Sequence, residues 1–271
     1  MQLLTTRFQV MPNRFDVFAT IFFTTAITQT KAIETTMSIP SVQPYPTLAD
    51  LYKAASKAFC NLANECISEY GVFRVSLSGG STPKRLYEMI ACESLQWNRI
   101  HWFFGDERNV PPESPDSNFR MVHEALLSKI DAPESNVHPV MVNLDDPATA
   151  ANEYQCLLEQ HFQGQKMPVW DLVLLGMGDD SHTASLFPNT AAIEETSRWF
   201  VENWVEKFDA YRYTLTAPAI NSAIERWFLV SGESKRQALA NVWSDPLSVS
   251  DYPAQLIDAT EWFVTEDAMP R

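Results

Sequence analysis

The sequence predicts an α/β fold with an open, mainly parallel sheet that carries helices on both faces. Short apolar segments alternate with amphipathic helical segments from about residue 47 onward, and this alternation is typical of parallel sheets. The segment 171–175, DLVLL, is apolar after its first residue, as in a strand buried on both faces. The chain shows no internal repeat and no low-complexity linker, so we expect one domain over 37–271.

Five segments have the pattern of helices. In the first, 47–70, apolar residues recur at helical spacing and Gly71 ends the pattern. In the second, Thr82 is the expected N-cap and Pro83 occupies the first helical position. The predicted helices are 47–70, 81–94, 115–130, 147–162 and 233–243. The segments expected to contain strands are 72–80, 99–108, 136–142, 171–176, 211–220, 226–232 and 260–268.

Residues 1–36 differ from the rest of the chain. Arg7 and Arg14 precede an apolar stretch of about a dozen residues, which is too short to span a bilayer comfortably. One interpretation is a weak signal or transit peptide. The other is a poorly ordered extension or a start codon placed too early, because Met37 opens a segment that resembles a fresh beginning. We favour the second interpretation, with a single folded domain at 37–271.

The composition limits the classes of function. The net charge is −14, which argues against general binding to nucleic acid or to an anionic membrane, since both need a basic face. A pocket can still be locally basic, so a small anionic ligand fits this composition. The four cysteines form no C-x-x-C pair, so we expect free thiols and a cytoplasmic, reducing compartment. These cysteines are Cys60, Cys66, Cys92 and Cys156.

Polar residues follow four of the predicted strands. Ligands of open α/β sheets bind outside the carboxyl ends of the strands, so a parallel sheet would bring these four groups together in one crevice. The groups are Gly79, Gly80, Ser81 and Thr82; Asp106, Glu107 and Arg108; Asp179, Asp180 and His182; and Ser231, Gly232 and Lys235.

The first of these groups suits an anion. Glycines at 79 and 80 let backbone N–H groups approach a ligand closely, and the following helix N-terminus favours negative charge. Lys84 and Arg85 lie in the first helical turn, where a cation is disfavoured by about 0.3–1 kcal/mol unless an anion binds nearby. The alternative interpretation is an ordinary capped helix with solvated basic residues. The loop matches neither a Walker motif nor a dinucleotide fingerprint.

His182 is the candidate base among five histidines. It follows Asp179 and Asp180 in a loop that begins with glycine. A carboxylate that holds one imidazole nitrogen leaves the other free to accept a proton. His101 and His138 fit structural roles, and His123 and His161 lie in predicted helices, where we expect them near the surface. The G-x-S-x-G elbow of many serine hydrolases is missing from the sequence.

Taken together, the motifs resemble the 6-phosphogluconolactonase family. They occur in the family's order and cover nearly everything from about residue 45 to 265. The matching pieces are LSGGSTPKRLYE, HWFFGDERNVPPESPDSNFRM, DLVLLGMGDDSHTASLFP, YRYTLTAPAIN and FLVSGESKRQAL. The resemblance implies hydrolysis of 6-phosphoglucono-δ-lactone to 6-phosphogluconate in the oxidative pentose phosphate pathway, without metal or cofactor. It also implies a Rossmann-like fold shared with glucosamine-6-phosphate deaminases and sugar-phosphate isomerases.

The resemblance also implies roles for individual residues. His182 looks like the base that activates water, and Asp180 is similar to the carboxylate beside it. Asp106 and Arg108 resemble residues that line the lactone end. Arg212 and Lys235 look like phosphate ligands, together with the amides and hydroxyls of Gly79, Gly80, Ser81 and Thr82. The expected partner is a small sugar-phosphate lactone, and the oligomeric state stays open, a monomer being compatible.

One position departs from the family pattern. The family usually has glycine immediately before the histidine, and Ser181 stands there in this chain. If the position requires a positive φ, serine costs about 1–2 kcal/mol. If φ is negative, serine is harmless.

Two alternative functions remain. A glucosamine-6-phosphate deaminase or isomerase has the same fold, but deaminases typically continue after the histidine with IAFNEP, whereas this chain has TASLFP. A non-catalytic sugar-phosphate sensor would keep the phosphate ligands and would not need the base. Because His182, Asp180 and Asp106 are all present, we favour the lactonase.

Overall fold

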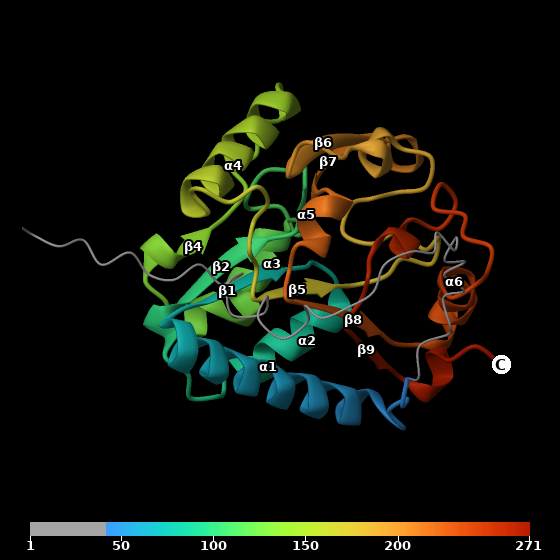
Figure 1. The fold of residues 1–271 in the computed structure, drawn as a ribbon, viewed down its shortest axis with the longest axis horizontal. Helices are drawn as coiled ribbons and strands as arrows, with labels where there is room; N and C mark the ends of the chain where they lie inside the picture. Colours follow the sequence, from blue (N-terminus) through green and yellow to red (C-terminus); the bar gives the residue numbers. More distant parts are fainter. Residues whose placement is uncertain (1–41) are drawn as a thin grey trace, which may run out of the picture. The chain divides into compact units, whose positions relative to one another are not determined.

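A computed structural model describes residues 42–271, and the predicted extension at 1–36 lies outside the described residues. The main sheet has six strands in the order β4-β2-β1-β5-β8-β9, and all its neighbours are parallel (Figure 1). Its strands are β1 Phe73–Leu77, β2 Ile100–Phe104, β4 Val137–His138, β5 Leu172–Leu175, β8 Glu225–Val230 and β9 Glu261–Val264. The predicted α/β class with a mainly parallel sheet is confirmed.

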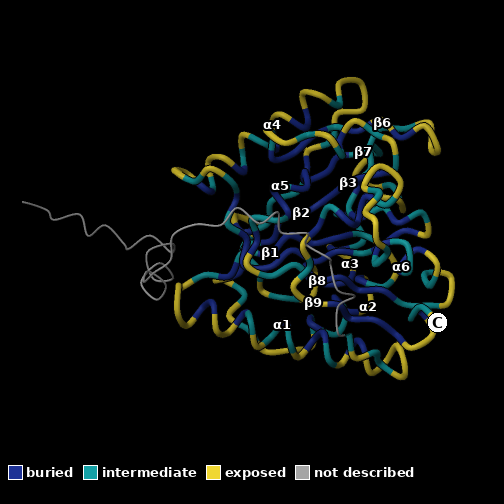
Figure 2. Tube along the Cα trace, turned by 45° about the vertical axis from the view of Figure 1, so that its right-hand side comes forward, coloured by how far each residue is buried: buried dark blue, intermediate teal, exposed yellow. Residues whose placement is uncertain are grey.

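Helices lie on both sides of this sheet, with α1 and α2 on one side and α4 on the other (Figures 1 and 2). The helices are α1 Leu48–Tyr70, α2 Ser81–Ile90, α3 Asn118–Ala125, α4 Pro147–His161, α5 Ala217–Asn221 and α6 Arg236–Val242. The central strands β1 and β2 are buried at all but one residue each, and all four residues of β5 are buried (Figure 2). Within residues 42–271, no helix combines the length and apolar character needed to cross a bilayer.

The start of α2 differs from the prediction. The helix begins at Ser81, and Gly80 occupies the N-cap position with φ 104° and no side-chain cap. Thr82 therefore lies in the first turn and is not the cap. A glycine at this position leaves the first N–H groups of the helix without a side-chain partner, so they remain available to a ligand.

A second, antiparallel sheet was not predicted. It has the order β3-β7-β6, with β3 Asp106–Arg108, β6 Phe200–Val205 and β7 Ala210–Leu215. The predicted strand over 99–108 is two strands in two sheets, and the predicted strand over 211–220 ends at Leu215 before α5. Gly105 joins the sheets, since its N–H donates to Leu77 in β1 and its carbonyl accepts from Leu215 in β7, both at 2.8 Å.

Candidate active site

A cavity of about 290 Å³ lies where the carboxyl ends of β1, β5 and β8 meet the second sheet. Nine of the ten predicted site residues line it, and the tenth, Asp180, contacts His182. The nine are Gly79, Gly80, Ser81, Thr82, Asp106, Arg108, His182, Arg212 and Lys235. Arg212 lies within a strand, as the sequence predicts, but that strand is β7 of the antiparallel sheet.

The glycine loop is shaped by a neighbouring amide. A Cβ on Gly79 would lie 1.8 Å from Oδ1 of Asn118, so a larger residue fits only if the buried Asn118 side chain moves. On the other side of the loop, the hydroxyls of Thr82 and Ser231 lie 3.1 Å apart. This hydrogen bond joins the first turn of α2 to the loop after β8. Both segments line the same cavity.

The segment 106–108 divides its side chains between two sides of β3. Asp106 and Arg108 line the cavity, whereas Glu107 is buried and accepts hydrogen bonds from the backbone N–H groups of Asn118 at 2.7 Å and Phe119 at 2.8 Å. Strand alternation explains this division. Burial raises the pKa of Glu107, and the backbone N–H donors oppose that rise. Glu107 thus holds the N-terminus of α3 and does not belong to a surface ion cluster.

Asp106 is fixed by a hydroxyl. It is 7% exposed, and its Oδ2 accepts from Oγ of Ser185 at 2.9 Å. Its carbonyl accepts from the side-chain amide of Asn118 at 2.9 Å. Because both contacts are short and buried, the carboxylate has a defined position in the cavity wall.

Two arginines stand opposite each other in the second sheet. Arg108 in β3 is the register partner of Arg212 in β7. Arg108 donates to the carbonyl of Asp116 at 2.6 Å, and the Arg212 guanidinium lies 5.0 Å from the centroid of the Phe208 ring. Burial lowers the pKa of Arg212, and the charge of Arg108 lowers it further. Like charges on facing residues of a sheet are unfavourable, so the pair suits an anion in the cavity.

His182 is held by a carboxylate. Its Nδ1 lies 2.5 Å from Oδ1 of Asp180, and Oδ2 of Asp180 accepts from Nζ of Lys207 at 2.8 Å. Burial alone would raise the pKa of Asp180, but the hydrogen bonds from His182 and Lys207 outweigh it and place this pKa well below its usual range. An ionised carboxylate only accepts hydrogen bonds, so Nδ1 carries the hydrogen and Nε2 has the free lone pair.

The histidine ring is confined on two sides. It stacks on Phe187, with ring centroids 4.0 Å apart and an interplanar angle of 28°. A Cβ on Gly178 would lie 2.0 Å from Nδ1 of His182. Glycine at 178 therefore leaves the space that the imidazole occupies, a role that the sequence analysis did not assign.

Ser181 adopts the left-handed conformation, with φ 62°. The sequence left the sign of this angle open, and the structure shows the unfavourable case. The residue is 1% exposed, its hydroxyl donates to the carbonyl of Ala238 at 3.1 Å, and its own carbonyl accepts from Ala254 at 3.0 Å. These contacts keep Ser181 in the conformation that a glycine would adopt at less cost.

Lys235 reaches the cavity from the short 3-10 turn after β8. Its Nζ lies 2.5 Å from Oδ1 of Asp179, whose side chain is 68% exposed. The exposed carboxylate orients the ammonium group, and only one of its three N–H donors is used in this contact. The remaining donors are available to a ligand.

Three side chains near the site escaped the sequence analysis. Phe187 stacks on His182, Phe208 lines the cavity, and Lys207 pairs with Asp180. Lys207 and Phe208 lie in the connection between β6 and β7. The sequence does not predict the strand β6, and the hairpin that β6 forms with β7 brings this connection to the site. No local motif marks Lys207.

The fold and the cavity define a class of protein. It is an α/β protein with a locally basic cavity at the carboxyl edge of a parallel sheet, where a carboxylate-held histidine lies among Arg108, Arg212 and Lys235. The overall charge of −14 contrasts with this local balance.

Comparison with known proteins identifies the family. Residues 46–265 match the family described as glucosamine-6-phosphate isomerases/6-phosphogluconolactonase, and the chain belongs to this family. It is 44% identical to the 6-phosphogluconolactonase of Nostoc sp. over 193 residues, 70% of this chain and 80% of that protein. It is 43% identical to that of Synechocystis sp. over 195 residues, 71% and 80% of the two chains.

Solved structures agree with this assignment. The 6-phosphogluconolactonase from Trypanosoma cruzi is 29% identical, with a TM-score of 0.75 over 86% of this chain and 96% of that chain. The 6-phosphogluconolactonase from Thermotoga maritima is 29% identical, with a TM-score of 0.72 over 82% and 98% of the two chains. The resemblance inferred from the sequence motifs is thereby confirmed.

Proposed function

We propose that this chain is a 6-phosphogluconolactonase, which hydrolyses 6-phosphoglucono-δ-lactone to 6-phosphogluconate with water that His182 activates. The names of its relatives support the reaction. The observation that carries the mechanism is the Asp180–His182 pair, whose Nδ1 contact directs the free Nε2 lone pair to accept a proton. The proposed mechanism needs no metal and no cofactor.

His182 takes part in two proton transfers during the reaction. Nε2 of His182 takes a proton from water while the water oxygen forms a bond to C1 of the lactone. The carbonyl oxygen becomes an oxyanion, which a cation at the lactone end, Arg108, stabilises; donors to such an oxyanion are worth about 3–4 kcal/mol. When the tetrahedral intermediate collapses, the bond between C1 and the ring oxygen breaks, and the imidazolium returns its proton to that oxygen. The new carboxyl group then loses a proton to solvent.

The phosphate is remote from C1, so its binding energy positions the ring for attack. We assign this group to Arg212, Lys235 and the loop from Gly79 to Thr82. The loop supplies hydroxyls and helix N–H groups, and the two cations supply charge. Asp106, held by Ser185, faces the sugar portion of the ligand.

Two further inferences concern the compartment of the protein and the residues that form its catalytic unit. The four cysteines are free, which suits a reducing compartment such as the cytoplasm. Rice relatives that are 33% identical are named as probable chloroplastic enzymes, so mass spectrometry of the native N-terminus is the appropriate test. We propose that residues 37–271 form the catalytic unit and that residues 1–36 are dispensable for activity.

The test is a lactonase assay with the lactone generated in situ and with spontaneous hydrolysis subtracted. We expect His182→Gln to lower kcat by about 10²–10⁴-fold, the usual contribution of a positioned base. His123→Gln, at an exposed histidine, is the matched control and should keep full activity. Ammonia release from glucosamine 6-phosphate should be absent from the parent protein. Full lactonase activity in His182→Gln would falsify the mechanism, and ammonia release without lactone hydrolysis would overturn the assigned reaction.

A further inference from the structure

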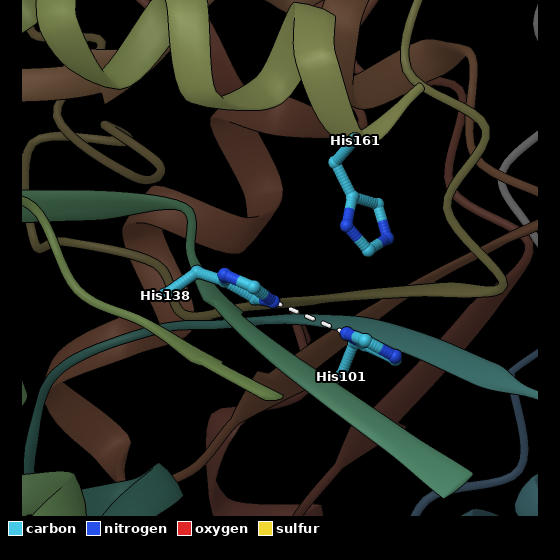
Figure 3. Close-up of side chains that lie close together, drawn as sticks. All are labelled: His101, His138 and His161. Atoms are coloured by element: carbon cyan, nitrogen blue, oxygen red, sulfur yellow. Dashed lines mark hydrogen bonds between the residues drawn. The ribbon is translucent and has the colours of Figure 1, made fainter. Parts of the chain in front are cut away.

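Three of the five histidines meet at a place away from the cavity. His101 lies in β2, His138 in β4 and His161 at the last position of α4, and Figure 3 shows the three rings grouped together. None of them lines the cavity that contains His182. The sequence predicts His161 near the surface, and the residue is partly exposed there, but its Nε2 atom is buried.

The spacing of the ring nitrogens resembles that of a metal site. Nδ1 of His101 and Nε2 of His138 lie 3.1 Å apart, and the ligand nitrogens of all three residues lie within 4.8 Å of one another. Two nitrogens bound to one tetrahedral Zn²⁺ at the usual bond length lie about 3.3 Å apart. The separation of the His101–His138 pair is therefore close to the one that an ion requires, and the distances to the His161 ring exceed it by up to about 1.5 Å.

A second observation points to a missing partner. Nε2 of His161 is buried and has no hydrogen-bond partner in the described part of the chain. Buried polar atoms are nearly always satisfied, so an unpaired nitrogen on a ring that contacts two other imidazoles needs an explanation. A metal ion bound between the three rings would satisfy it and would replace the hydrogen bond between His101 and His138.

The charges around the three rings affect how tightly an ion would bind. Burial and, to a smaller extent, the neighbouring imidazoles together lower the pKa of His138 to about 4 and of His161 to about 3. Arg74, the register partner of His101 in β1, acts against a dication, since its charge also lowers the pKa of His101 and His161.

We propose that His101, His138 and His161 form a Zn²⁺ site that ties β2, β4 and the end of α4 together. Three imidazoles with a fourth position open to water are an established ligand set for this borderline-soft ion. Phe103 stacks on the His138 ring, and Phe162 contacts the His161 ring edge to face. Trp170 packs against Phe162, so these three aromatic side chains form an apolar wall beside the site. The nearby Arg74 makes us expect weaker binding than at closed structural zinc sites.

The experiment uses the full chain, stripped of metal by a chelator and titrated with Zn²⁺ against a chromophoric competitor. The parent should bind one ion per chain, and its thermal midpoint should rise with Zn²⁺. His161→Phe keeps an aromatic ring against Phe103 and Phe162 and removes the ligand nitrogen. We expect it to lose at least about 100-fold in zinc affinity. His123→Phe, at an exposed histidine outside the cluster, should bind as the parent does.

Co²⁺ provides a second measurement that does not depend on a variant. The parent should show the intense visible absorption of four-coordinate cobalt, and His161→Phe should not. Lactonase activity should be the same in the metal-free and zinc-loaded protein, because the cluster does not line the cavity. The proposal is overturned if His161→Phe binds Zn²⁺ as tightly as the parent, or if the parent gives no cobalt absorption. Loss of activity on zinc loading would place the ion at His182 and would overturn it equally.

Discussion

Arg108 and Arg212 face each other across β3 and β7, yet neither guanidinium forms an ion pair with a carboxylate among residues 42–271. Two cations in this position repel each other, and the strand pairing keeps them together. The fold thus holds positive charge ready for a ligand. The repulsion destabilises the free protein, and a bound anion relieves it, which favours binding.

Replacing Arg212 separates these two effects. We expect Arg212→Met to raise the KM for the phosphorylated lactone by about 10- to 100-fold, since hydrogen bonds to charged groups contribute about 1.5–3 kcal/mol. The change in kcat should be small if the lost interaction is uniform binding. Without ligand, the variant should unfold at the same temperature as the parent or higher, because the repulsion is gone.

Inorganic phosphate offers a direct measurement of the same site. It should raise the thermal midpoint of the parent and have less effect on Arg212→Met. Arg120→Met is the control, because Arg120 pairs with Glu124 on the surface of α3 and does not line the cavity. Equal stabilisation of all three proteins by phosphate would contradict the assignment.

Ser181 can be tested by two substitutions that differ in one respect. Ser181→Ala keeps the left-handed backbone strain and loses the hydroxyl bond to Ala238, so it should lower the free energy of unfolding by about 1 kcal/mol. Ser181→Gly also loses that bond but relieves a strain of about 1–2 kcal/mol. Denaturant titration should therefore find Ser181→Gly more stable than Ser181→Ala. The reverse order would mean that φ at this position is not the controlling factor.

Asp180 and Lys207 should affect turnover to different degrees. Asp180→Asn removes the acceptor that fixes the hydrogen on Nδ1 of His182, so kcat should fall by about 10²–10⁴-fold. Lys207→Met leaves the carboxylate in place and removes one of its two side-chain donors, and we expect a fall of about 2–10-fold in kcat. KM should change little in either variant, because neither residue lines the cavity. A larger loss in Lys207→Met than in Asp180→Asn would refute this order.

The three clustered histidines make the metal-free protein sensitive to acid. In the unfolded chain a histidine has a pKa of about 6.5, whereas burial lowers the pKa of His138 to about 4 and of His161 to about 3 in the fold. The unfolded state therefore binds more protons within this window. The neutral rings contribute stability that is fully present above about pH 6.5 and is lost as the pH falls toward 4.

His161→Phe should weaken this dependence. It removes one titrating ring, and it also removes a neighbour that lowers the pKa of the others, although Arg74 still faces His101. The free energy of unfolding, measured at pH 7.5 and 5 in chelator, should fall less in the variant than in the parent. Identical losses in the two proteins would show that other groups control the acid transition.

The parallel sheet could be predicted because its strands are buried on both faces and therefore read as apolar runs such as 172–175. The helix α1 could be predicted because the spacing of its apolar residues and the residues at its two ends both indicate a helix with the same bounds. The second sheet could not, since β3 consists of Asp106, Glu107 and Arg108, which have little intrinsic preference for a strand. Pairing with β7 alone makes it one.

The same distinction applies to the site. Residues in motifs, such as His182 and Gly79, could be selected from the sequence. Lys207 could not, because its contact with Asp180 depends on how the β6–β7 hairpin folds. The histidine cluster could not be predicted either. His138 comes close to His101 because β4 pairs with β2, and the sequence does not reveal this strand order.

The two sheets meet at Gly105, and the basic side chains of the cavity are divided between them: Arg108 and Arg212 belong to one, and Lys235 follows a strand of the other. A phosphate dianion that contacts the two arginines and Lys235 together would therefore link the two sheets. Amide hydrogen exchange in β6 and β7 should therefore slow when phosphate or substrate binds, while exchange in β9 stays unchanged. Ligand binding then makes the β6–β7 hairpin more rigid.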